Sequence, residues 1–133
     1  MSKTNNIPED SYTSEIKESY KPLTGKEKVR FKDLTASRKL DELVTESESL
    51  RIELANYILL GVHNPSAENP DYNVVIIIDK NGDSYYTSSD TFYRALTDII
   101  EAMDGETDDW GIEVVKRPSS NYKGKFFITC TVY

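Results

Sequence analysis

The sequence predicts a mainly β domain that carries one helix, and three observations support this prediction. Short runs rich in β-branched and aromatic residues recur along the 133 residues, separated by clusters of Gly, Pro, Asn and Ser. One long stretch, Ser88–Asp104, has apolar residues at spacings of three and four, which is typical of an amphipathic helix. Between two strand-like runs lies Asn81-Gly82, a strong hairpin signal because both central residues of a type I′ turn need φ > 0.

The N-terminal third of the chain changes character twice. Residues 1–26 are polar and lack periodicity, so we expect a disordered arm there and a folded domain over 27–133. Thr35–Val44 predicts a short helical turn with Leu40, Leu43 and Val44 directed inward. In Leu50–Val62 apolar and polar residues alternate as in a half-buried strand, and Ala55-Asn56 is the expected position of a bend or bulge.

The middle of the chain predicts a hairpin that leads directly into the helix. The unbroken β-branched run Val74–Ile78 suits a strand covered on both faces, and Ser84–Thr87 is its partner. Ser88 or Ser89 is the expected N-cap of the helix, and Gly105 is expected to end it. The expected apolar stripe of this helix consists of Phe92, Leu96, Ile99, Ile100 and Met103.

A second hairpin, formed by Trp110–Lys116 and Lys125–Tyr133 around the turn at 118–124, completes the chain. The order is then a long strand, a hairpin, a helix and a hairpin. This is the order of an OB-fold, a five-stranded Greek-key barrel with one helix between strands three and four. A generic α+β sheet with one covering helix is the alternative.

Charge is unevenly distributed along a chain whose net charge is −7. Residues 17–40 carry a net charge of +5, residues 41–113 carry −14, and residues 114–133 carry +4 with no acid. Segregated positive charge can form a local anion site in an acidic protein. No apolar run is long enough to span a bilayer and the N-terminus lacks the apolar core of a signal peptide, so we expect a cytoplasmic protein without membrane contact.

The residues give little support to a catalytic function. The single cysteine, Cys130, excludes an internal disulfide and a multi-Cys zinc site, and its strand position predicts a core role. His63 lies in no recognisable nucleophile motif. In Asp79–Asp83 the glycine falls at the wrong position for a calcium loop, so a hairpin turn is expected. We therefore expect no enzyme activity, no metal and no cofactor.

The last hairpin is the candidate binding site. Single-strand binders need cations that follow the phosphates and aromatic rings that stack on bases. Cations and aromatics of this kind gather around the turn of the last hairpin and on nearby strands, where the alternative role of the aromatic rings is to pack the barrel. The candidate residues are Lys116, Arg117, Tyr122, Lys123, Lys125, Phe127, Tyr85 and Tyr57; the facing of Tyr86 stays open.

One loop argues against a nucleic-acid groove. The segment from His63 to Asp71 contains Glu68 and Asp71 and no Lys or Arg, so it would leave one rim of the groove without cations. The basic residues of the N-terminal segment could supply that rim if the segment folds back onto the domain. These residues are Lys26, Lys28, Arg30, Lys32, Arg38 and Lys39.

Residues 74–132 resemble the small OB-fold single-stranded DNA-binding proteins of tailed bacteriophages. The resembling features are the strand VVIIID, the Asn-Gly-Asp turn, the short YYTSS strand that opens the helix, and the closing pattern EVVKRPSSNYKGKFFITCTV. The resemblance implies a non-enzymatic protein that coats single-stranded DNA during phage replication or recombination in the host cytoplasm. It also implies replication or recombination proteins as further partners, and homo-oligomers are compatible with it.

A second function remains open from the sequence. The acidic middle of the chain could serve a phage-encoded protein-interaction module or inhibitor that binds a basic host protein. This function predicts no oligonucleotide binding and a partner that is lost when the acids of residues 104–109 are neutralised.

Overall fold

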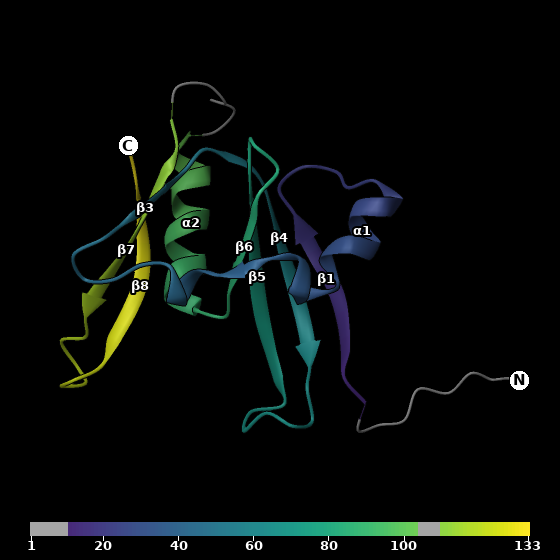
Figure 1. The fold of residues 1–133 in the computed structure, drawn as a ribbon, viewed down its shortest axis with the longest axis horizontal. Coiled ribbons are helices and arrows are strands. Elements are labelled where there is room, and N and C mark those ends of the chain that lie inside the picture. Colours follow the sequence, from purple (N-terminus) through teal and green to yellow (C-terminus); the bar gives the residue numbers. More distant parts are fainter. Residues whose placement is uncertain (1–10, 104–109) are drawn as a thin grey trace, which may run out of the picture.

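The computed structural model describes residues 11–103 and 110–133, and within these residues the protein is mainly β (Figure 1). Strands hold 42% and helices 23% of the described residues, which confirms the expected mainly β composition. The strands are β1 (Thr13–Ser19), β2 (Arg38–Lys39), β3 (Leu50–Ile52), β4 (Leu54–His63), β5 (Asp71–Asp79), β6 (Ser84–Thr87), β7 (Ile112–Pro118) and β8 (Phe126–Val132). The helices are α1 (Gly25–Phe31) and α2 (Asp90–Met103), with short 3-10 turns η1 (Leu34–Ala36) and η2 (Leu40–Glu42).

The long strand predicted at Leu50–Val62 joins the two sheets of the structure. Its first part, β3, pairs with β7 in a three-stranded sheet of order β3-β7-β8. Its second part, β4, lies in a five-stranded sheet of order β1-β4-β5-β6-β2. The register against β5 shifts between Leu54 and Asn56, which confirms the predicted bulge at Ala55-Asn56.

Strand β5 is covered on both faces, as its unbroken apolar run predicts. Val75 and Ile77 pack into the core between the two sheets, where Phe92 and Leu96 of α2 also lie. Val74, Ile76 and Ile78 point to the opposite face and pack with Phe31 of α1. The first side is the inner face of the five-stranded sheet and the second is its outer face.

The turn between β5 and β6 differs from the predicted two-residue type I′ turn. The Gly82 N–H donates to the Asp79 carbonyl (3.0 Å), and the Asp79 N–H donates to the Asp83 carbonyl (2.9 Å), which leaves a three-residue loop. One carboxylate oxygen of Asp79 also accepts the N–H groups of Asn81 and Asp83. Gly82, with φ of 90°, takes the left-handed position that follows a type I turn in such loops. These two hydrogen bonds to the Asp79 side chain stabilise the three-residue loop.

Ser89, one of the two predicted N-caps, precedes helix α2, and its hydroxyl accepts the Phe92 N–H at 3.1 Å. Replacing this N-cap, Ser89→Ala, is expected to lower the free energy of unfolding by about 1 kcal/mol, because one orphan N–H loses its partner. Urea unfolding measures the change. The control is Ser88→Ala at the exposed neighbour, and an equal loss in both variants would contradict the assignment of the cap. Gly105, the expected end of the helix, lies outside the described residues.

The disordered arm predicted for residues 1–26 is wrong from residue 13 onward, while residues 1–10 lie outside the described part. Strand β1 pairs antiparallel with the free edge of β4, from Thr13 opposite His63 to Ser19 opposite Ile58. Helix α1 follows with a capping box between Thr24 and Glu27. Strand β1 has one apolar residue that packs on the outer face, Ile16, so the edge of β4 and not its own composition orders it.

The helical turn predicted at Thr35–Val44 is present as η1 and η2, and Leu40 and Val44 are fully buried in the inner core. Between these turns, β2 pairs in parallel with β6. Within the described residues neither sheet closes on itself, since β6 pairs with β5 and β2 while β8 pairs with β7 alone. In Figure 1, α2 lies between β6 and β8, where it packs into the core that the two sheets share. No helix in the described part has the length and apolarity to cross a membrane.

Candidate nucleic-acid interface

The hairpin formed by β7 and β8 extends beyond the core and ends in a defined loop. Pro118 pairs with Phe126 at the last position of the β7–β8 ladder. The Ser119 N–H donates to the Lys125 carbonyl (2.9 Å), and the Lys125 N–H donates to the Tyr122 carbonyl (3.0 Å). Gly124 has φ of 81° and lets the chain turn back into β8. The loop is therefore held by its own hydrogen bonds and presents its side chains from a fixed backbone.

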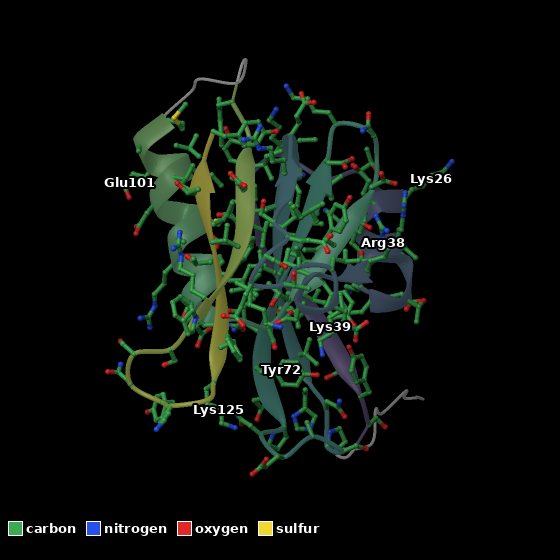
Figure 2. The ribbon with its side chains drawn as sticks, turned by 60° about the vertical axis from the view of Figure 1, so that its left-hand side comes forward. Lys26, Arg38, Lys39, Tyr72, Glu101 and Lys125 are labelled. Carbon is green, nitrogen blue, oxygen red and sulfur yellow. The ribbon has the colours of Figure 1, made fainter. Side chains whose placement is uncertain are left out.

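Cations lie on both faces of this hairpin. Lys116 shares a face with the buried Ile128 opposite it, while Arg117 shares the other face with Phe127. Lys116 is half-buried, with its Nζ 6.0 Å from the centre of the Phe126 ring. Arg117, Lys123 and Lys125 are exposed at or beside the tip. Figure 2 shows Lys125 at the loop end of this hairpin.

Aromatic side chains accompany the cations. Tyr122 is 69% exposed at the tip, and Phe126 is 47% exposed at the start of β8. Phe127 is half-buried on the other face of the strand. The pattern of β8 predicted that Phe126 shares the core face with Ile128, and this parity is correct, but Phe126 lies past the end of the core. Its position one residue after the loop was the available signal for exposure.

Two predicted stacking residues, Tyr57 and Tyr85, are buried, which corrects their assignment to the binding surface. Tyr57 and Tyr85 both stand opposite Ile77 in the sheet, one on each side, so all three point into the inner core. The Tyr57 ring stacks on Tyr20 at 6.1 Å, and burial followed by the charge of Glu18 raises the Tyr57 pKa. Tyr85 is 5% exposed. Neither ring has a face open to a nucleobase, because the strand period directs both inward.

The charges that the hairpin itself carries favour an anion. No acidic residue follows Glu113 in the chain. Glu113 itself is occupied, since one oxygen lies 3.8 Å from Arg51 Nε and the other accepts the Ser49 hydroxyl at 2.5 Å. The cations of the loop therefore have no acid in their own strand that neutralises them.

The acidic loop between β4 and β5 is also present, with Asp71 hydrogen-bonded to His63 Nδ1 at 2.7 Å. A groove of about 630 Å³ crosses the neighbouring ends of β1, β4 and β5, and Lys17 lies in it, with its Nζ donating to the side-chain Oδ1 of Asn73 at 2.9 Å. Because Glu15 and Asp71 also line this groove, it is a poor site for phosphate.

The basic N-terminal segment does fold back onto the domain, as the candidate second rim requires. Phe31 of α1 packs on the outer face of the five-stranded sheet, and Leu34 packs beside it. The six candidate cations of the segment are all exposed: Lys26, Lys28, Arg30, Lys32, Arg38 and Lys39. Arg38 lies over the Tyr85 ring at 5.2 Å and Arg30 over the Phe31 ring at 5.0 Å, so two of these cations already have an aromatic partner.

The single cysteine and the acidic side chains give no sign of a reactive centre in the described residues. Burial raises the pKa of the Cys130 thiol to about 12, so the thiol stays protonated at neutral pH. Within residues 11–103 and 110–133, no three His, Cys, Asp or Glu side chains gather closely enough to hold a metal ion.

No family model, curated protein or solved structure matches this chain. The candidate interface therefore rests on its own geometry: an ordered hairpin with four cations, two exposed aromatic rings and no acid after Glu113.

Proposed function

We propose that this protein binds single-stranded DNA without sequence preference, through the cationic and aromatic β7–β8 hairpin. The observation that carries the proposal is the exposure of Tyr122 and Phe126 among Lys116, Arg117 and Lys123 at the end of an ordered loop. Stacking on exposed rings tolerates any base, and cations in a row follow the phosphates.

The proposal includes an OB-like arrangement of the strands. A long bent strand shared by two sheets, a hairpin, a helix and a second hairpin follow one another in the order of that fold. In OB-folds the loop that corresponds to 119–125 flanks the nucleic-acid site, so the fold and the charged loop support the same function. The resemblance of residues 74–132 to phage proteins extends the proposal to a non-enzymatic role in phage DNA replication or recombination, in the host cytoplasm, with proteins of those processes as partners.

A titration with oligo-dT at several salt concentrations tests this function. Binding is expected to quench intrinsic fluorescence, to favour single over double strands, and to weaken with a slope of about −3 in log K against log salt if four cations contact phosphates. An absence of binding to oligo-dT at low salt would rule the proposed function out.

A protein-interaction function is the second candidate, and the exposed acids of α2 favour it. Asp90, Asp98 and Glu101 are exposed on this helix, and Figure 2 shows Glu101 directed away from the sheets. The acids of residues 104–109, on which this candidate also depends, lie outside the described residues. A basic protein partner retained by the chain, together with no response to oligo-dT, would favour this function.

A further inference from the structure

A groove on the outer face of the five-stranded sheet lies where β5 and β6 meet the N-terminal segment. Val74 is 2% exposed and forms its floor, while Tyr72 and Tyr86, both half-buried, stand on either side. The volume of the groove is about 340 Å³, within the range of sites for small ligands. The remaining lining residues are Leu34, Lys39, Ala67, Asn69 and Ser88.

The strand register explains why these side chains meet. Tyr86 stands opposite Ile76 on β5 and opposite Lys39 on β2, so Lys39 lies beside the Tyr86 ring on the outer face. Tyr72 lies two residues before Val74 on β5, so both side chains are on the outer face of the sheet. Strand β2 belongs to the N-terminal segment. This segment therefore supplies the cation of a groove whose rings come from β5 and β6.

A third tyrosine extends the aromatic surface. Tyr12 is 49% exposed and lies two residues before Ser14, which is opposite Val62, the residue that pairs with Tyr72 in the sheet. Burial and then the nearby charge of Tyr72 raise the pKa of Tyr12. The carboxylate of Asp33, whose charge also raises the pKa of Tyr12, accepts hydrogen bonds from the backbone N–H and the hydroxyl of Thr35. The residues that line the groove thus include aromatic rings and Lys39, and none of them is an acid.

We propose that this groove binds a nucleobase of the same single strand, stacked against Tyr72 or Tyr86, with Lys39 on an adjacent phosphate. The proposal rests on the proposed function and adds a second contact to it. Tyr72 in the groove and Lys125 at the tip of the β7–β8 hairpin both lie toward the lower end of the molecule in Figure 2, and Lys39 lies nearer its middle. A strand that crosses this end can reach both contacts, whereas a very short strand can reach one.

The test compares variants of the full chain by fluorescence anisotropy with labelled oligo-dT of short and long lengths. Tyr72→Leu with Tyr86→Leu is expected to weaken binding of the long oligonucleotide about 5- to 50-fold, because a stacking contact is lost. Lys39→Ala, at an exposed position, is expected to lower the salt slope by about 0.7 without affecting the fold. The matched control is Tyr133→Leu, at an exposed tyrosine outside the groove.

Crosslinking of the unmodified protein keeps the proposal testable if the tyrosine variants unfold. Photoactivated 4-thiothymidine in oligo-dT is expected to crosslink to Tyr72 or Tyr86 as well as to the hairpin. Binding that depends on the hairpin, with unchanged affinity in the groove variants and crosslinks confined to the hairpin, would overturn the groove and leave the proposed function intact. No binding of oligo-dT by the unmodified protein would overturn both.

Discussion

Replacing the four hairpin cations Lys116, Arg117, Lys123 and Lys125 together by alanine is expected to weaken oligo-dT binding by about one to two orders of magnitude at low salt. If each cation contacts one phosphate, the salt slope should fall by about 3, because each contact with a single strand contributes about 0.7. The change should leave folding intact, since three of the four side chains are exposed and Lys116 is half-buried. Fluorescence anisotropy over a range of salt concentrations measures both quantities.

A control with the same loss of charge separates the hairpin from net charge. Lys17, Lys21, Lys80 and Arg94 are exposed, and they belong neither to the hairpin nor to the six candidate cations of the second rim. Replacing these four by alanine should change the affinity far less than the hairpin variant does. Equal losses in both variants would mean that binding responds to overall charge, and the hairpin would then not be the site.

Replacing Phe92 by alanine is expected to lower the free energy of unfolding by about 3–5 kcal/mol, the largest effect on stability that we predict for a single change. Phe92 is fully buried in the core that α2 shares with both sheets, so its removal leaves a cavity between these layers. Such a loss is a large part of the roughly 5–15 kcal/mol that stabilises a typical domain. Urea unfolding followed by far-UV circular dichroism measures it.

The comparison for Phe92→Ala is Val29→Ala, because Val29 is 76% exposed on α1 and should change stability by less than about 0.5 kcal/mol. If the alanine variant does not fold, Phe92→Leu should show a smaller loss in the same direction. A loss at position 92 no greater than that at position 29 would contradict the position of α2 in the core.

The sequence pattern predicted those elements whose stability depends on their own residues and near neighbours in the chain. Val74–Ile78 is apolar on both faces and is covered on both. The bulge near Asn56 and the N-cap at Ser89 follow from local chemistry. Strand β1 could not be found in this way, because TSEIKES has the composition of a solvated segment and is ordered only by pairing with the edge of β4.

The candidate site shows the same division. The exposure of Tyr122 and the lysines beside it followed from a polar turn that carries no acid. Tyr57 and Tyr85 could not be sorted by type, since a tyrosine suits both a core and a wet surface. Their burial depended on which face of the sheet receives α2 and the second sheet, and that is a tertiary fact. The groove at Tyr72 and Tyr86 likewise needs Lys39, which is far away in the sequence.

By itself, the sequence determined the mainly β composition, the order of the strands from Leu50 onward, and the concentration of positive charge in the last hairpin. These properties depend on the period of the apolar residues and on charges that lie close together in the chain, and both are local features of the sequence. Only the tertiary structure decided that the N-terminal segment covers the outer face of the five-stranded sheet, and which tyrosines stay accessible. Pairing at a strand edge and burial between layers join residues distant in the chain, so no local pattern records them.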